Sequence, residues 1–287
     1  LQYFFDFSEV KGQRNIKRAM EIAAAGGHNI LLIGPPGAGK TMLAKRLPSI
    51  LPPMTLQEAL EATKIHSVAG KSKTRKGLIT ERPFRSPHHT ISDVALIGGG
   101  SSPQPGEISL AHNGVLFLDE LPEFKRNVLE VLRQPLEDRI VTVSRAKFTV
   151  DYPAGIMLVA SMNPCACGYY NHPKKECVCP RGSVKKYLNK VSGPLLDRID
   201  LHVEVTPVEF DELTQSKKEE SSKVIRERAS KAREIQLKRF ISSNDIHSNS
   251  QIPNTSSEPS CKLDPESSKL LKLAMDKLNL SGRAFDR

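Results

Sequence analysis

Tryptophan is absent from this chain of 287 residues, and aromatic residues make up only 5% of it. The few phenylalanines and tyrosines are not interleaved with the basic runs, so the sequence shows no stacking platform for the bases of a single-stranded nucleic acid. No apolar run approaches the roughly 18 residues of a membrane-spanning helix, and no signal-peptide pattern opens the chain. We therefore expect a cytoplasmic protein with no membrane partner.

Acidic residues are outnumbered: 32 Asp and Glu stand against 42 Lys and Arg, which gives a formal net charge of +10. Such a charge favours acidic partners and is compatible with nucleic acid, but an ordinary solvated basic surface has the same composition. The first residue is Leu1, and the chain stops at Arg287, shortly after a new helix is predicted to begin. We therefore expect a fragment of a longer protein.

A glycine-rich loop lies between a predicted strand at residues 29–33 and a predicted helix at residues 42–47. It consists of Gly34, Pro35, Pro36, Gly37, Ala38, Gly39, Lys40 and Thr41. The glycines let backbone N–H groups point at a polyphosphate, Lys40 would neutralise its β and γ oxygens, and the Thr41 hydroxyl would ligate Mg²⁺. The order of strand, loop and helix therefore predicts a nucleoside-triphosphate site rather than a chance glycine-rich turn.

A second motif supports this interpretation. The apolar run at residues 114–118 ends in two acids, Asp119 and Glu120. Asp119 would hold the Mg²⁺ through water, and Glu120 is placed to polarise an attacking water molecule. The pair predicts an enzyme that hydrolyses the nucleotide rather than a protein that only binds it.

Two further polar residues follow predicted strands or helices of the same domain. Asn163 comes directly after the strand expected at residues 156–160, where an amide can orient the attacking water or contact the γ-phosphate. Arg198 follows a short predicted helix. It would either pair with Asp197 or Asp200 in its own subunit or point outward as an arginine finger for a neighbouring subunit.

Apolar runs and helical patterns alternate along the first 206 residues. Strands are predicted at residues 30–33, 115–118, 156–160 and 201–205. This alternation is typical of an α/β fold with a parallel sheet covered by helices on both faces. A helix is expected at residues 125–136, ended near Pro135. Two β-branched runs, at residues 139–144 and 147–150, predict a β-hairpin inserted ahead of the strand that leads to Asn163.

Residues 207–287 are predicted to form a small, incomplete helical lid domain after the core at residues 1–206. Helices are expected at residues 212–239 and 263–278, joined by a Ser- and Asn-rich linker at about 242–260 that we expect to be mobile. A further helix would begin near Ser281, which suits an N-cap. Its Arg283 could reach the γ-phosphate across the cleft between the domains.

Cysteines and histidines offer candidate metal ligands. Four of the five cysteines form two Cys-x-Cys pairs with nine residues between them, namely Cys165, Cys167, Cys177 and Cys179. Four thiolates gathered by one loop would make a tetrahedral Zn²⁺ site. Free buried thiols, or a disulfide formed on purification, remain open alternatives. His88 and His89 are adjacent and cannot easily face one metal, so we expect a structural or pore-lining loop there.

Taken together, five segments resemble the magnesium-chelatase-like AAA+ ATPases of the YifB/ComM type. They cover residues 7–13, 34–41, 82–93, 105–120 and 192–205. The resemblance implies a P-loop AAA+ core that binds ATP between the subunits of a ring, a hexamer in this family. It also implies that Asn163 is sensor 1, Arg198 the arginine finger and Arg283 sensor 2.

The resemblance further implies that the hairpin at residues 139–150, and an insertion at about 96–108, face a central pore. In this family the competence protein ComM acts as a DNA helicase that promotes branch migration, whereas the magnesium chelatase motor subunit drives metal insertion into a porphyrin. Family members usually carry an N-terminal Lon-protease-like domain and a longer C-terminal helical domain.

Two functions therefore stay in view, a DNA-remodelling ATPase motor and a protein-remodelling or metal-insertion motor that never touches nucleic acid. A third possibility, an assembly switch that scarcely turns over, is disfavoured by Glu120. In the first case DNA would pass through the pore, and Arg139, Arg145 and Lys147 of the hairpin would contact its backbone. No residue is placed to read base edges, so the sequence alone does not choose between them.

Overall fold

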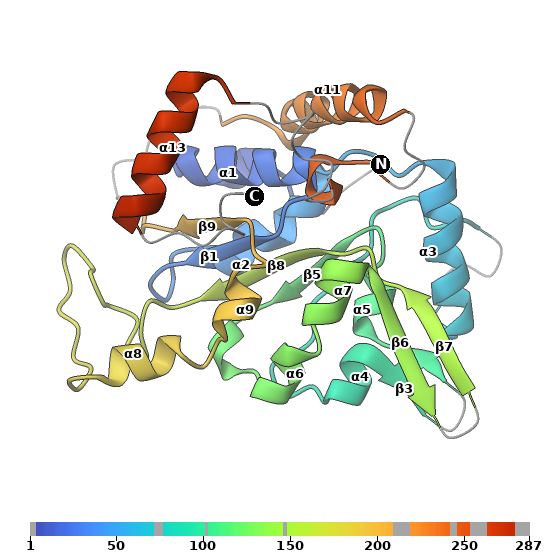
Figure 1. Cartoon of the computed structure of the whole chain (residues 1–287), viewed down its shortest axis with the longest axis horizontal. Helices are drawn as coiled ribbons and strands as arrows, with labels where there is room; N and C mark the ends of the chain where they lie inside the picture. Colours follow the sequence, from blue (N-terminus) through green and yellow to red (C-terminus); the bar gives the residue numbers. More distant parts are fainter. Residues whose placement is uncertain are drawn as a thin grey trace.

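The computed structural model of the chain describes residues 4–71, 77–100, 103–145, 148–208, 219–241, 246–252 and 263–278. A five-stranded parallel sheet forms its centre, in the order β2-β5-β8-β1-β9 (Figure 1). The strands are β1 (Ile30–Ile33), β2 (Phe84–Arg85), β5 (Val115–Leu118), β8 (Met157–Met162) and β9 (Leu201–Glu204). Four of the five were predicted; β2, with two residues, was not.

Helices cover both faces of the sheet, as predicted. In Figure 1, α1 (Arg14–Gly26) and α11 (Ser222–Arg239) lie above the sheet, and α4 (Asp93–Ile97) and α6 (Arg126–Glu130) lie below it. The remaining described elements are η1 (Phe7–Glu9), α2 (Lys40–Arg46), η2 (Leu47–Ile50), α3 (Leu56–Val68), β3 (Gly98–Gly99), β4 (Gln104–Pro105), α5 (Glu107–Leu110), η3 (Leu121–Glu123), α7 (Arg133–Asp138), β6 (Ile140–Arg145), β7 (Phe148–Pro153), α8 (Ser183–Leu188), α9 (Gly193–Leu196), η4 (Asn249–Gln251) and α13 (Pro265–Leu278).

The central strands are apolar on both sides because each face of the sheet has its own core. Val115 and Phe117 of β5 pack into one core with α1, α2 and α11, while Leu116 and Leu118 pack into the other with α4, α6 and α9. Successive side chains of a strand point to opposite faces, so an uninterrupted apolar run is what a doubly covered strand requires.

The helix expected at residues 125–136 was wrong in its extent. Two short helices, α6 and α7, occupy this region, and Pro135 lies in the first turn of α7 instead of ending a helix. Proline is tolerated there because the first-turn N–H groups have no partner inside the helix.

The inserted hairpin is confirmed. Strands β6 and β7 pair antiparallel from Ile140 opposite Pro153 to Arg145 opposite Phe148, directly ahead of β8. Its turn, residues 146–147, lies outside the described residues. The insertion expected near residues 96–108 contains a second small antiparallel pair, β3 with β4.

The C-terminal region contains two helices close to those predicted, but α11 begins at Ser222 because residues 219–221 are not helical, and α13 begins at Pro265. Helix α11 packs along α1, and the Ser222 hydroxyl accepts a hydrogen bond from Phe7 N at 2.8 Å. Within the expected linker, η4 is held by a 2.8 Å bond from Asn249 N to Gln236 Oε1. Arg283 lies outside the described residues. No described helix combines the length and the apolar character that crossing a membrane requires. The boundary at residue 206 remains a prediction.

We predict that Gly114→Ala destabilises the fold. An added Cβ would lie 2.0 Å from Pro83 O, on the chain just before β2, so β2 would have to move away from β5. Overpacking of this kind costs about 1 to 3 kcal/mol of unfolding free energy. Gly193→Ala is the matched control, since its Cβ would meet no described heavy atom within 4 Å. Equal midpoints of urea unfolding for the two variants would contradict the prediction.

Candidate functional site

The glycine-rich loop lies at the carboxyl end of the sheet, between β1 and α2. Gly34 N donates to Met162 O at 3.2 Å, so the start of the loop is fixed to β8. Gly37 and Gly39 have φ angles of 78° and 89°, a left-handed conformation that side chains other than glycine rarely adopt. Gly39 is the N-cap of α2 and offers no side-chain cap, so the first-turn amides of that helix face outward for an anion.

Lys40 is buried at this loop and already has oxygen partners. Its Nζ donates to Gly34 O at 2.7 Å, to Pro35 O at 2.9 Å and to Asn163 Oδ1 at 3.1 Å. Burial lowers the pKa of the Lys40 ammonium below its usual range, although the carboxylates of Asp119 and Glu120 oppose this shift. The hydrogen bond to Lys40 places Asn163 beside the loop, which is the position predicted from its place after a strand.

Thr41 and Asp119 meet across the site. Thr41 Oγ1 donates to Asp119 Oδ2 at 2.7 Å, and the other carboxylate oxygen accepts from the Ser161 hydroxyl. Hydroxyl and carboxylate oxygens are the ligands that Mg²⁺ prefers. Ser161 was not assigned a role from the sequence. Once β5 is known to pair with β8, Leu118 lies opposite Ala160, and the next residues, Asp119 and Ser161, become neighbours.

Glu120 stands beside these groups on strained backbone. Its φ is 56°, a left-handed value that is uncommon for a residue with a side chain, and its carboxylate is exposed. His89 Nδ1 lies 3.6 Å from Glu120 Oε2. The His89 ring lies tilted against the His88 ring, with centroids 4.0 Å apart, and meets the Phe124 ring edge-on.

His89 is therefore a candidate residue that the sequence analysis missed when it treated the histidine pair as a structural or pore-lining loop. No signal in the sequence could have found it. The contact depends on β2 lying next to β5, and β2 is too short to show a strand pattern.

Gln13 links the N-terminal segment to the phosphate loop. Its Nε2 donates to Ala38 O at 3.1 Å and to Thr206 O at 3.2 Å, so one amide joins the segment before α1, the loop, and the chain after β9. Its Oε1 is buried and accepts no hydrogen bond from the described residues. The sequence analysis noted this segment only for its resemblance.

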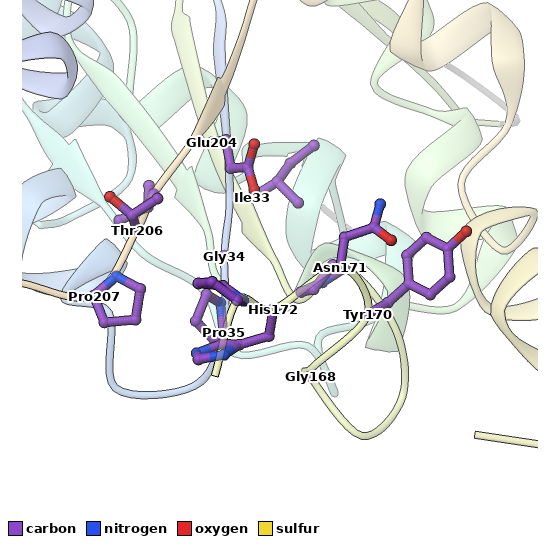
Figure 2. Close-up of a pocket in the computed structure, with 13 residues that line it drawn as sticks. Ile33, Gly34, Pro35, Gly168, Tyr170, Asn171, His172, Glu204, Thr206 and Pro207 are labelled. Atoms are coloured by element: carbon purple, nitrogen blue, oxygen red, sulfur yellow. The ribbon is translucent and has the colours of Figure 1, made fainter. Parts of the chain in front are cut away.

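A cavity of about 230 Å³ adjoins the loop (Figure 2). It lies between the start of the loop at Gly34 and Pro35, the chain after β9 at Thr206, and the chain after β8 at Tyr170 and His172. The chain after β8 packs closely on the phosphate loop: a Cβ at residue 168, where Gly168 has a φ of 86°, would lie 2.5 Å from Pro36 Cδ. The segment that carries the cysteines therefore forms one wall beside the loop.

The four predicted cysteines converge in this segment. Their Sγ atoms all lie within 4.8 Å of one another, and Cys165 Sγ is 3.3 Å from Cys167 Sγ and 3.8 Å from Cys177 Sγ. Four sulfurs around a tetrahedral zinc with Zn–S bonds near 2.3 Å are separated by ~3.8 Å. A hydrogen bond from the Tyr169 backbone lowers the pKa of the Cys167 thiol to about 6, whereas desolvation and hydrogen bonds with the neighbouring thiols raise the pKa of the Cys177 thiol to about 12. The donor set fits a metal, and none of the four is in a disulfide.

Arg198 does not face its own phosphate loop. Its side chain is buried, donates to Pro194 O, and lies with Nη2 2.5 Å from Glu137 Oε1 of α7. Neither Asp197 nor Asp200, the partners considered from the sequence, holds this guanidinium. The structure thus brings Lys40, Thr41, Asp119, Glu120 and Asn163 together in one subunit, and leaves Arg198 apart from them.

The chain is similar to several known proteins. Residues 6–213 match the family model described as magnesium chelatase, subunit ChlI, and residues 219–287 match that of its C-terminal part. Over 283 residues the chain is 46% identical to the competence protein ComM of Haemophilus influenzae and 46% identical to the uncharacterized protein YifB of Escherichia coli. Each match covers 98% of this chain and 54% of the relative.

A more distant match is the magnesium-chelatase 38 kDa subunit of Cereibacter sphaeroides, 26% identical over 179 residues, which cover 56% of this chain and 53% of that protein. The chain spans about half the length of the curated relatives it matches. The family model covers most of the chain, and the five-stranded parallel sheet with its phosphate loop is consistent with a P-loop AAA+ core. The chain therefore belongs to the magnesium-chelatase-like AAA+ family.

Proposed function

We propose that this chain is the ATP-hydrolysing module of a cytoplasmic ring motor, a hexamer, that remodels DNA. The observation that carries the ATPase assignment is the 2.7 Å contact between Thr41 and Asp119, with Lys40 and Asn163 joined 3.1 Å apart beside it. These groups come from three separate parallel strands or their following loops, and all four are of the type that positions a polyphosphate and its metal.

The proposed chemistry requires these side chains to give up their present hydrogen-bond partners for a nucleotide, its Mg²⁺ and a water molecule. Lys40 would leave the two loop carbonyls for the more negative β and γ oxygens, and Asn163 would be free to turn toward the attacking water. Thr41 and Asp119 would hold Mg²⁺, which shields phosphate charge when it is bound. Glu120 would polarise the water, and His89 is close enough to orient the Glu120 carboxylate. Arg198 would act on the nucleotide of a neighbouring subunit, and Arg283 would contact the γ-phosphate in its own.

DNA as the substrate is supported by the net charge of +10, by the inserted hairpin, and by the similarity to a protein named for competence. The similarity to a magnesium-chelatase subunit favours the alternative, a motor for protein remodelling or metal insertion. Arg139 does not fit the set of DNA contacts expected from the sequence. It is half-buried at the base of the hairpin and donates to Ser250 O at 3.4 Å, so Arg145 and Lys147 at the tip are the candidates.

We further propose that the four cysteines hold one Zn²⁺. A structural zinc would fix the chain between Asn163 and α8, which has few apolar side chains of its own to bury.

The ATPase assignment is tested by two substitutions with different expected results. Lys40→Ala should abolish ATP binding, because it removes the charge that neutralises the phosphates. Glu120→Gln should bind ATP normally and hydrolyse it about 100-fold or more slowly, because only the water-polarising group is lost. Lys45→Ala, on the exposed side of α2, is the control and should change neither quantity. Binding of a fluorescent ATP analogue measures ATP affinity, and release of phosphate measures the rate of hydrolysis. Equal loss of affinity in both test variants would contradict the assignment.

Metal analysis tests the zinc site. Protein purified under reducing conditions without chelator should contain one zinc per chain, and Cys177→Ser should lower this stoichiometry because three thiolates hold zinc less tightly than four. Cys261→Ser, remote in sequence, is the control that should retain the metal. A zinc content near zero in the unsubstituted protein would leave the loop as a cluster of free thiols.

DNA binding is tested at the hairpin tip. Each lost phosphate contact should flatten the slope of log affinity against log salt by about 0.7 to 0.9. Arg145→Ala with Lys147→Ala should therefore weaken binding to all DNA sequences alike and leave the ATPase rate without DNA unchanged. Lys231→Ala with Lys238→Ala, exposed on α11, removes the same charge elsewhere. If the hairpin pair and the control pair give the same salt slope, the protein-remodelling alternative becomes the better explanation.

A further inference from the structure

The pairing of the buried Arg198 guanidinium with Glu137, whose side chain is 38% exposed, is unexpected for an arginine that acts on a neighbouring subunit. The Arg198 side chain is only 6% exposed, and its two terminal nitrogens are occupied by Glu137 and by the carbonyl of Pro194. Its Nε is buried and donates no hydrogen bond to any described residue. A buried N–H without an acceptor is unfavourable, so this conformation is not the best that the guanidinium could reach.

Glu137 lies where α7 leads into the inserted hairpin. It is the penultimate residue of α7, and Arg139, the C-cap of that helix with a φ of 58°, leads directly into the hairpin strand β6 at Ile140. Figure 1 shows α7 running into the hairpin. A displacement of the hairpin would therefore be transmitted to the Glu137 carboxylate across three residues of backbone.

The arginine segment and the hairpin also share one core. Leu195 of α9 and Ile199 pack in the same buried cluster as Val141 and Val143 of β6, and Leu136 of α7 packs against that cluster. Close-packed interiors transmit strain because they have little free volume to absorb it. The packing therefore couples the position of the hairpin to the position of Arg198 as well as to that of Glu137.

We propose that Glu137 is a positioning residue that holds Arg198 inward, and that engagement of the hairpin by substrate releases the arginine toward the nucleotide of the neighbouring subunit. The proposal rests on the trans role given to Arg198 under the proposed function. Glu137 itself contacts neither nucleotide nor substrate.

The exchange is favourable on electrostatic grounds once a nucleotide is presented at a subunit interface. The guanidinium gives up one carboxylate oxygen and one carbonyl oxygen, and a terminal phosphate offers several oxygens with more negative charge in a geometry that suits two parallel N–H donors. Without that anion the Glu137 pair is the lower-energy state. The arginine is thus kept away from the interface until an anion competes for it.

The alternative is a purely structural role, in which the Arg198–Glu137 pair only anchors the segment after α9 to α7. Removing the carboxylate then leaves the buried guanidinium with one acceptor fewer, which destabilises the fold, and activity falls with it. The two explanations predict opposite changes in the ATPase rate, so a mild substitution separates them. Glu137→Gln is suitable because it keeps the shape and an acceptor oxygen but weakens the hold on a cation.

The experiment measures ATP hydrolysis by the full-length protein in its assembled form, with and without DNA, together with its thermal unfolding midpoint. Glu137→Gln should raise the rate without DNA by about threefold to tenfold, the effect expected from loss of a charge-assisted hydrogen bond in the resting state. The ratio of the hydrolysis rate with DNA to the rate without DNA should therefore fall toward one. Glu130→Gln is the matched control: Glu130 pairs with Arg133 at 2.8 Å, three residues along the same stretch of chain, and its substitution should change neither rate.

Two further variants keep the outcomes distinct. Arg198→Ala should hydrolyse ATP slowly, and Arg198→Ala with Glu137→Gln should be as slow as Arg198→Ala alone, since release matters only if the arginine is present. Mixing Arg198→Ala with Lys40→Ala subunits should restore part of the activity at shared interfaces. If Arg198→Ala keeps the full rate, the trans role in the proposed function fails. The positioning role is overturned, and the trans role stands, if Arg198→Ala hydrolyses ATP slowly but Glu137→Gln has an unchanged hydrolysis rate. The same conclusion follows if Glu137→Gln hydrolyses ATP more slowly and has a lower unfolding midpoint.

Discussion

Pairing of β8 between β1 and β5 is the constraint on which the candidate site depends. Ala160 of β8 lies opposite Leu31 of β1 on one side and Leu118 of β5 on the other, so one register fixes both neighbours. All six residues of β8 are buried. A slip by one residue would exchange the two cores and is excluded by packing on both faces. The same register sets the phosphate loop, the acid pair and Asn163 at one edge, which is where parallel sheets carry their ligands.

Within this frame the polar groups satisfy one another. Lys40 is held by carbonyls and by Asn163, Thr41 by Asp119, and Asp119 by Ser161. Burial alone would disfavour the Lys40 ammonium, and the adjacent carboxylates offset part of that cost. A site built this way gathers its side chains at one edge of the sheet, so a polyphosphate would exchange with hydrogen-bond partners that are already in place.

Features that are local in sequence were predictable. The phosphate loop, the acid pair and the strands that carry them are short contiguous patterns, and their chemistry follows from residue type and order. The cysteine cluster was found for the same reason, because its four cysteines lie in one loop. Pro135 was misread because a proline in the first turn of a helix and one that ends a helix look alike in sequence.

Contacts between distant segments were not predictable. His89 meets Glu120 only because a two-residue strand, β2, lies next to β5, and Arg198 meets Glu137 across 61 residues of chain. Hydrophobic periodicity carries no information about which charged side chain a buried arginine will choose. The two aspartates nearest to Arg198 in sequence were the natural candidates, but Asp200 instead accepts a hydrogen bond from Asn29 N at the start of β1.

At the proposed nucleotide site, selectivity would follow because a ligand has to replace the oxygen partners that Lys40 holds. A neutral or singly charged molecule offers Lys40 no more than the two carbonyls and the amide oxygen that it already holds, so the exchange yields little. A polyphosphate offers several charged oxygens at once, so one ligand can replace all of these partners together. The same reasoning extends to Arg198, whose carboxylate partner is a stronger competitor than a carbonyl. Among the described residues, both cations are therefore held by oxygen acceptors, Lys40 by two carbonyls and an amide and Arg198 by a carbonyl and a carboxylate. A nucleotide would have to exchange with these acceptors at either group.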